Sequence, residues 1–445
     1  MNGQASLGRL LERWLEQRDP HATRAGVIEV VDVEVLVPGR PGVLDVVAEI
    51  DGRLAHAVLG IRRPGDELRV LGTLEEPTIG TIEDDDGVGL VTDALHDADA
   101  ARLLLGVVAG TSQRAGGVQR GPAGPVVSLV RDDDEATSLA FDRRFTLTVF
   151  PWLSRGPHPG TTLLAGLDES GFNHLPAPIA FWRRAGLDLG VVQELLAGMS
   201  SGWALAISSL RDVIASGVSP DVAGGDFAPE ALALGTMAAR MHIALDRAFG
   251  RRVGDIAVWV DELRNDVLTS AAIDLADPGR DDIGAAGARG TGGSLASIEE
   301  LLDALRASGL HPPAIRTHGD FHLGRTARTD HGWVLADCMP GGTVPGSAEP
   351  LFRCPLADVA DFTWSLRHAA AVAASERGPA SSPTRAGDLA SAWEARNRRA
   401  FVAAYLATPG IGGLIPADRR IVRGIIRLFE LARAARGRVG AASVR

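Results

Sequence analysis

The sequence contains no lysine, and all 45 of its basic residues are arginine. No step of a reaction in this protein can therefore use a lysine side chain. Cysteine is scarce as well: Cys338 and Cys354 are the only two in 445 residues, and they do not suggest a disulfide scaffold. Free thiols are typical of a protein from a reducing compartment, and we predict a cytoplasmic location.

The chain also lacks a net positive charge and long apolar runs. The formal net charge of −11 argues against nucleic acid as the main partner, because phosphate backbones are bound by clustered basic residues. Apolar runs such as Ala369–Ala374 are far shorter than a membrane span. The segment 1–20 carries charges throughout and has no apolar core, so we expect no signal peptide and no membrane partner.

Hydrophobic periodicity predicts that the chain opens with a helix and an antiparallel sheet. Apolar residues at helical spacing, from Leu7 to Leu15, predict a helix over 5–18. The turn Asp51-Gly52 is typical of a hairpin. It lies among Val- and Ile-rich runs that predict strands over 27–37, 43–50 and 53–61. We expect these elements to form a first module over residues 1–92.

A β-rich lobe over 93–196 and a helical lobe over 197–445 are expected to follow. The β-rich lobe has helical periodicity over 93–108 and then strand-like runs over 126–130, 138–141, 145–150, 176–182 and 187–196. The small residues of 197–202 are typical of a hinge. From Trp203 onward the apolar spacing predicts mainly helices.

Two acids in the helical lobe carry the candidate chemistry. Asp320 lies in a tight loop after a brief apolar run, within His318–Arg325, and Asp337 ends an apolar strand-like run. This arrangement can place both carboxylates at the mouth of one cleft. One could accept a proton from a hydroxyl while the other holds a metal ion. Phosphoryl transfer needs both roles, because its catalysis is mostly positioning and charge neutralisation around the moving phosphate.

Several segments together resemble the actinobacterial maltokinases, a family within the aminoglycoside phosphotransferase and protein-kinase-like superfamily. The segments that carry the resemblance are His318–Gly324 (HGDFHLG), Gly332–Asp337, Pro355–Asp361, Gly202–Asp212 and Val191–Glu194. The resemblance implies an α+β, two-lobed protein-kinase-like fold with an N-terminal cap subdomain, a β-rich intermediate lobe and a helical C-lobe.

The resemblance also implies an activity and a set of site residues. The family transfers the γ-phosphate of ATP to the anomeric hydroxyl of maltose, so ATP and Mg²⁺ are the implied cofactors. Asp320 would be the catalytic base and Asp337 the Mg²⁺ ligand, and Glu194 would lie on the nucleotide side of the hinge. The implied partners are a small sugar or a partner enzyme of glycogen or trehalose metabolism.

The chain departs from the family pattern at the residues that handle phosphate and metal. Thr148 stands where the family strand LILKVF has its phosphate-contacting lysine, and the next helix, from His158, lacks the paired glutamate. Arg325 replaces a metal-binding glutamine, although a guanidinium has no acceptor atom and repels Mg²⁺. The family's Asp-Phe-Glu reads Asp337-Cys338-Met339 here. These replacements predict weak or absent turnover of Mg·ATP.

Two functions of different class therefore follow from the sequence. The first is a pseudokinase that acts by binding a sugar, a nucleotide or a partner enzyme. The alternative is an active ATP-dependent kinase for maltose, glucose or an amino sugar, or, as a third option, an aminoglycoside-type phosphotransferase. Asp320 is accordingly either a base or a loop cap, and Asp337 either a metal ligand or a strand-end acceptor. Arg325 either replaces a cation or is a solvated surface residue.

Overall fold

The protein forms two compact units. The structure, a computed structural model, describes residues 2–18, 27–72, 77–84, 86–110, 125–196, 198–223, 225–276, 295–338, 352–376 and 383–442. As far as the chain is described, the first unit comprises Met1–Thr162 and Pro176–Ala197, and the second comprises Leu163–Leu175, Gly198–Gly341 and Pro350–Arg445.

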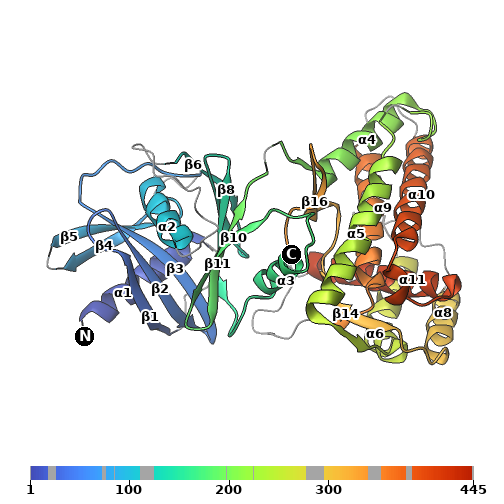
Figure 1. The fold of residues 1–445 in the computed structure, drawn as a ribbon, viewed down its shortest axis with the longest axis horizontal. Helices are drawn as coiled ribbons and strands as arrows, with labels where there is room; N and C mark the ends of the chain where they lie inside the picture. The colour runs from blue at the N-terminus through green and yellow to red at the C-terminus, as the bar shows by residue number, and fades with distance from the viewer. Residues whose placement is uncertain are drawn as a thin grey trace. The chain divides into compact units, whose positions relative to one another are not determined.

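The first unit contains two antiparallel sheets. Its elements are α1 (Asn2–Arg18), β1 (Ile28–Val37), β2 (Gly42–Ile50), β3 (Arg53–Arg62), β4 (Thr78–Asp84), β5 (Gly87–Asp93), α2 (Ala98–Gly110), β6 (Val127–Asp132), β7 (Thr137–Phe141), β8 (Phe145–Val149), β9 (Trp152–Leu153), β10 (Pro178–Arg184) and β11 (Leu187–Glu194). A six-stranded sheet has the order β1-β2-β3-β5-β4 with β9 paired to β3, and a five-stranded sheet has the order β10-β11-β8-β7-β6. Helix α2 contacts strands of both sheets (Figure 1).

The predicted opening helix is present as α1 and buries its apolar stripe on the first sheet. Leu11 and Trp14 are 1% and 2% exposed and belong to one core cluster with Val46 and Leu59 of strands β2 and β3. The helical spacing of the leucines in the sequence therefore corresponds to a real buried face.

The helix predicted over 93–108 begins later, at Ala98, because the preceding acids have other partners. Asp93 ends β5, and the Asp97 carboxylate accepts hydrogen bonds from the backbone amides of Asp99 (3.0 Å) and Ala100 (3.2 Å). An acid that accepts these otherwise unpaired N–H groups marks the start of a helix. The prediction was wrong by five residues at this boundary.

A cluster of charged side chains ties the two sheets of the first unit together. His96 is 1% exposed and lies 3.5 Å from Asp93 at the end of β5 and 3.1 Å from Asp132 at the end of β6. Arg18 of α1 lies 3.2 Å from the same Asp132. Burial by itself lowers the pKa of His96, but Asp132 and Asp93 outweigh it and raise this pKa to about 9.

The second unit is mainly helical, with two small antiparallel sheets. Its elements are the end of α3 (Pro159–Glu169), β12 (Ser200–Ser201), α4 (Gly202–Ser216), α5 (Ala228–Phe249), β13 (Arg251–Val253), α6 (Ile256–Ala276), α8 (Leu295–Ala307), β14 (Pro313–Arg316), the 3₁₀ turns η2 (Leu323–Arg325) and η3 (Ile411–Gly413), β15 (Thr326–Thr329), β16 (Gly332–Leu335), β17 (Phe352–Arg353), α9 (Leu356–Ser375), α10 (Pro383–Ala407) and α11 (Arg419–Ala442). The sheets have the orders β12-β15-β16 and β13-β14-β17.

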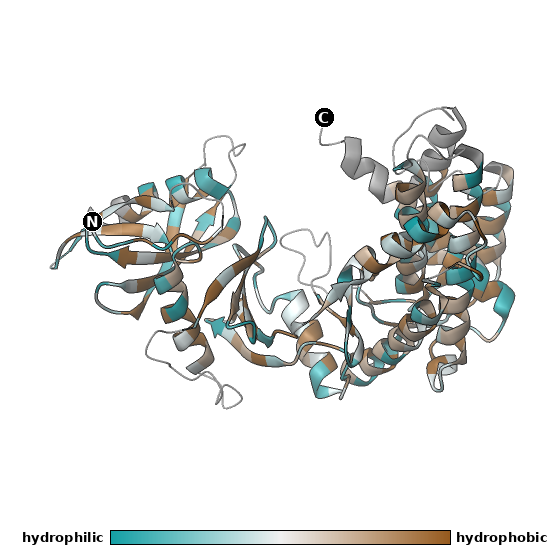
Figure 2. Ribbon diagram, turned by 90° about the horizontal axis from the view of Figure 1, so that it is seen from above, coloured by the Kyte–Doolittle hydropathy of each residue, from teal (hydrophilic) through white to brown (hydrophobic). Residues whose placement is uncertain are grey.

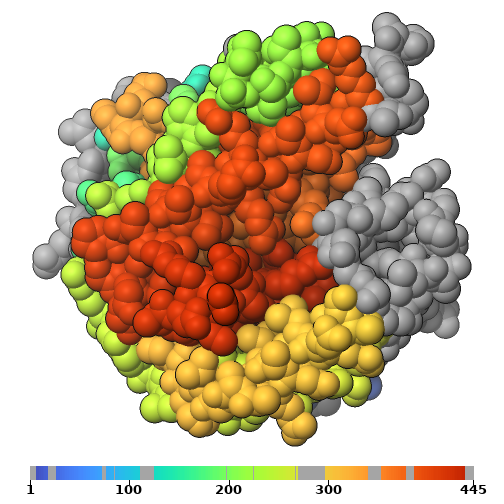
Figure 3. Space-filling model, turned by 90° about the vertical axis from the view of Figure 1, so that its right-hand side faces the viewer, coloured from blue at the N-terminus to red at the C-terminus, as the bar shows by residue number. Residues whose placement is uncertain are grey.

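Helix α9 is packed between α10 and α11, and α10 also packs along α5. Hydrophobic and hydrophilic residues are interspersed on the helices of this unit, as expected for amphipathic helices (Figure 2). On the face seen in Figure 3, α8 in yellow lies beside α11 in red. Hydrophobic periodicity did not predict β12, β13 and β17, because strands of two or three residues are too short to show alternation.

Among the described residues, no helix combines the length and the apolar character that crossing a bilayer requires.

The environment of His96 predicts that the stability of the first unit depends on pH. The folded state binds the His96 proton more tightly than the unfolded state, so the stabilisation is complete below the ordinary pKa near 6.5 and is lost as pH rises through about 9. Within this range the free energy of unfolding should fall by up to about 1.4 kcal/mol per pH unit. Urea unfolding of the wild type and His96→Gln would check this, with exposed His331→Gln as control. A slope that persists in His96→Gln would contradict it.

Candidate functional site

The loop that carries Asp320 is held by one buried carboxylate. Asp358, in the first turn of α9, is fully buried and accepts hydrogen bonds from the backbone amides of His318 (2.8 Å) and Gly319 (2.9 Å). The imidazole of His242 on α5 lies 3.0 Å from the same carboxylate. Gly319 has φ +84°, a conformation that a side chain would strain. The loop geometry therefore depends on a helix that lies 40 residues further along the chain.

Phe321 fixes the position of Asp320 from the other side. Its ring is fully buried and stacks on Phe362 of α9 at a centroid distance of 5.3 Å. Phe362 in turn stacks on Phe401 of α10 at 4.1 Å. Because the residue next to Asp320 is packed in the core of the helical unit, the Asp320 carboxylate has little freedom to move.

The hairpin after the loop brings Arg325 and Asp337 together. Strands β15 and β16 pair with Thr326 opposite Leu335, and the backbone amide of Ala336 donates to the carbonyl of Arg325 (2.8 Å). This register puts Arg325 beside the residue that precedes Asp337. His318 adds a contact from its Nε2 to the Asp337 carbonyl at 3.0 Å.

Arg325 joins the two candidate acids through its guanidinium. Its Nη2 lies 3.1 Å from Oδ2 of Asp320, and its Nη1 donates to Oδ2 of Asp337. Its side chain is 13% exposed, so the interpretation of Arg325 as a solvated surface residue is wrong. Arg433 of α11 reaches the other oxygen of Asp320, with Nη2 at 2.9 Å from Oδ1. His322 lies 3.3 Å from Oδ2.

These neighbouring basic side chains determine the charge state of Asp320. Burial by itself raises the pKa of this carboxyl, but His322, Arg433 and Arg325 outweigh burial and hold the pKa well below its ordinary value. Asp320 is therefore ionised, and each of its oxygens already faces a positive donor. A group that holds its charge this firmly is a weak proton acceptor, since an effective general base has a pKa near the working pH.

The residues present do not fit a resident Mg²⁺ ion. Magnesium prefers oxygen ligands in a near-octahedral arrangement, but the nitrogen donors of Arg325 lie between the Asp320 and Asp337 carboxylates. In the described part of the chain, no three acidic, histidine or cysteine side chains form a cluster that could hold a metal ion. Met339, from the predicted strand end, lies outside the described residues.

The two nucleotide-side candidates lie in the first unit, on neighbouring strands. Thr148 of β8 is paired with Val191 of β11, and its hydroxyl shares a hydrogen bond with Ser138 of β7 at 3.0 Å. Glu194 is exposed at the end of β11, and its backbone amide donates to the carbonyl of Ala177. Thr148 thus completes a polar contact within the sheet, as a threonine in a strand commonly does. Its role toward a nucleotide stays a prediction.

Sequence reasoning missed two residues of the Asp320 site. Arg433 lies in α11, and no local sequence pattern indicates that it reaches a residue 113 positions earlier. Asp358 lies in the first turn of α9, and its role in holding the loop was not predicted from the sequence. Its place in the segment that resembles the family, Pro355–Asp361, was the available signal.

The thiol beside Asp337 is not a nucleophile. Cys338 is 6% exposed, and burial, with Asp337 adding to it, raises the pKa of its thiol far above the ordinary value. A thiol that resists ionisation is unreactive, because the thiolate is the reacting form.

Removal of the Asp358 carboxylate should destabilise the second unit strongly. Asp358→Ala leaves the buried amide of His318, the partly buried amide of Gly319 and His242 without their acceptor, and such a loss costs on the order of 3 kcal/mol. Urea unfolding followed by circular dichroism would measure it. Asp330→Ala, at the exposed turn of the β15–β16 hairpin, is the control and should change stability by less than about 0.5 kcal/mol. Equal effects of the two substitutions would contradict the assigned role.

Comparison with known proteins relates the chain to sugar kinases. No family model matches the sequence. The glucosamine kinase of Streptacidiphilus jiangxiensis is 30% identical over 260 residues, which cover 56% of this chain and 54% of that protein. The glucosamine kinase of Mycolicibacterium smegmatis is 28% identical over 234 residues, covering 50% and 53%. The matched region thus spans about half the length of these curated relatives, and the maltokinase resemblance stays a prediction.

A solved structure has a similar fold over nearly the whole length of this chain. The structure described as glucosamine kinase in complex with glucosamine, ADP and inorganic phosphate has a TM-score of 0.64 at 20% identity, and the match covers 95% of this chain and 91% of that one. At this identity the likeness establishes the fold. The protein therefore has the two-lobed α+β fold of the kinase-like proteins, as the sequence predicted.

Proposed function

We propose that this protein is a pseudokinase related to the sugar phosphotransferases, which binds a small sugar and has lost Mg²⁺-dependent transfer of phosphate from ATP. The glucosamine kinases among its relatives favour an amino sugar over maltose as the ligand. A partner enzyme of glycogen or trehalose metabolism remains the other proposed partner.

One observation carries the proposal: a single guanidinium occupies the space between the two acids. In a kinase of this class these acids would serve the hydroxyl and the metal ion. Here Arg325 contacts both, and Arg433 contacts the remaining oxygen of Asp320. The missing phosphate lysine at Thr148 points in the same direction, because a threonine cannot neutralise phosphate charge.

The geometry still supports the binding of a polar ligand near Asp320. Helix α9 carries Trp364 and His368, whose rings stack at 5.1 Å, and Arg433 lies over Trp364 at 5.5 Å. Arg433 therefore belongs both to the acid cluster and to an aromatic cluster. Aromatic faces with charged hydrogen-bonding groups beside them are typical of small polar ligand sites.

We expect no sugar-dependent ADP release from the wild type with Mg·ATP and glucosamine, glucose or maltose. The physical reason is that Asp320 is saturated with cations and that the lysine and the metal ligand set are absent. A coupled ADP-release assay would compare the wild type, Asp320→Asn and the matched exposed control Asp330→Asn. Turnover in the wild type and in Asp330→Asn that is lost in Asp320→Asn would overturn the pseudokinase proposal.

Replacement of Arg325 by the glutamine of the maltokinase pattern should create a response to Mg²⁺. In Arg325→Gln the carboxylates of Asp320 and Asp337 lose their shared cation, so the unfolding temperature should fall without metal and recover in millimolar MgCl₂. The wild type should show no such recovery. Arg328→Gln removes an ion-paired arginine from the same hairpin and serves as control. A Mg²⁺ response in the wild type equal to that of Arg325→Gln would show that Arg325 does not displace the ion.

An active amino-sugar kinase is the second candidate, and one observation favours it. Asp337 is only partly buried, with 26% of its side chain exposed, so a ligand can still reach it. If a bound nucleotide drew Arg325 toward its phosphates, the guanidinium would supply positive charge in place of the lysine. The ADP-release assay separates the two candidates, because only this one predicts turnover that depends on Arg325.

A further inference from the structure

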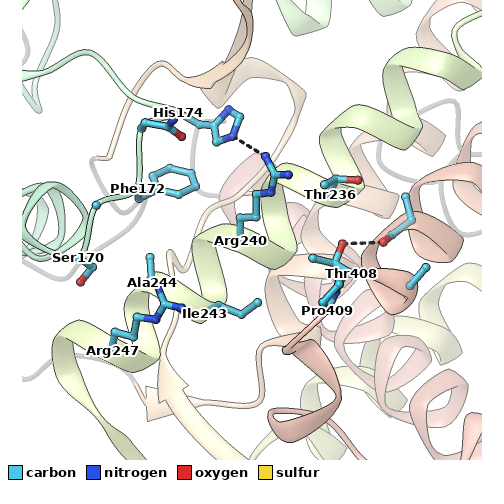
Figure 4. A pocket seen from close by; sticks show the side chains of 14 residues that line it. Ser170, Phe172, His174, Thr236, Arg240, Ile243, Ala244, Arg247, Thr408 and Pro409 are labelled. Atoms are coloured by element: carbon cyan, nitrogen blue, oxygen red, sulfur yellow. Dashed lines mark hydrogen bonds between the residues drawn. The ribbon is translucent and has the colours of Figure 1, made fainter.

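The second unit contains a pocket of about 680 Å³ that is separate from the Asp320 cluster. Its walls are the loop that follows α3, one face of α5, and the end of α10 with the residues after it (Figure 4). Neither Asp320, Arg325, Asp337 nor Arg433 lines it. A pocket of this size can enclose a small metabolite.

The pocket is positively charged although the protein as a whole is acidic. Arg240 and Arg247 extend into it from α5 (Figure 4), and none of the residues that line it is acidic. The two arginines are seven positions apart, so they lie on the same face of the helix with Cα atoms about 10 Å from each other. Within the described chain, neither guanidinium is within ion-pair distance of a carboxylate.

Among the described residues, the one polar contact of Arg240 leaves its charge uncompensated. Its Nη1 lies 3.3 Å from Nε2 of His174, whose Nδ1 lies 3.0 Å from the carbonyl oxygen of Trp333. Nδ1 must donate to that carbonyl, so Nε2 of the neutral ring accepts from Arg240. A neutral imidazole orients the guanidinium without neutralising it.

The remaining walls combine hydroxyl, amide and apolar groups. Asn173 and Thr236 provide a side-chain amide and a hydroxyl, whereas Phe172, Ile243 and Pro409 provide apolar surface. Paired guanidinium groups bind phosphate oxygens in planar, bidentate fashion. A hydroxylated ring can meet the amide and the hydroxyl through its polar edge and the apolar wall through its C–H face.

We propose that this pocket binds a phosphorylated sugar, with Arg240 and Arg247 on the phosphate and the wall formed by Phe172, Asn173 and Thr236 on the sugar ring. This inference does not depend on the proposed function, since it uses none of the residues of the acid cluster. It makes the pocket a second ligand site on the helical unit, distinct from the site near Asp320.

Calorimetric titration with glucosamine 6-phosphate would test the proposal on the full chain. Saturable binding is expected in the wild type, with at least a tenfold loss of affinity in Arg240→Gln/Arg247→Gln, because two charge-assisted contacts are removed. Arg420→Gln, an exposed arginine outside the pocket, has half the charge change and should bind like the wild type. Glucosamine alone should bind far more weakly than its phosphate ester, because it lacks the group that the arginines hold.

Three results would overturn the proposal. The first is the absence of saturable binding in the wild type. The second is an unchanged affinity in the double variant. The third is loss of binding in Arg325→Gln together with its retention in the double variant, which would place the ligand at the acid cluster. Inorganic phosphate that binds as tightly as the ester would refute the sugar part and leave a simple anion site. If the double variant fails to fold, Arg247→Gln alone, which removes no protein hydrogen bond among the described residues, should still weaken binding by about fivefold or more.

Discussion

The site depends on a cation that lies between two acidic side chains in a half-buried environment. The loop and the hairpin bring Asp320 and Asp337 to a common neighbour, and two such groups need a cation between them. In a metal-dependent kinase that cation is Mg²⁺. In this protein it is the guanidinium of Arg325, which is covalently part of the chain and contacts both acids. In the proposed pseudokinase, this exchange of one cation for another is what replaces a metal site by an ion-pair cluster.

The scaffold around the cluster is held by interactions that do not involve the Asp320 and Asp337 carboxylates. Asp358 still holds the backbone of the loop, and Phe321 still anchors it in the aromatic stack of the helical unit. These interactions stabilise the fold whether or not phosphate is transferred. Arg433 adds a second cation to Asp320 from the last helix, so the acid is stabilised in place at the expense of its basicity.

Much of the fold could be predicted from the sequence because its periodic patterns are strong. The leucine spacing of α1 and the hairpin at Asp51-Gly52 correspond to real elements. Helix boundaries and short strands were less predictable. Helix α2 begins five residues after its predicted start, since Asp97 acts as its cap. Strands of two or three residues leave no periodic signal in the sequence. The pocket formed by the loop after α3, by α5 and by the end of α10 could not be predicted, because its residues form no sequence motif and meet only in the folded chain.

The sequence by itself determined which chemical groups are available. It has no lysine, a threonine at position 148 and an arginine at position 325, and it carries the HGD segment that resembles a kinase family. Only the tertiary structure decided what those groups do, because an ion pair depends on distance in space. In the folded chain Arg325 is not a surface residue but contacts both Asp320 and Asp337. Arg433, 113 residues away in the sequence, contacts Asp320.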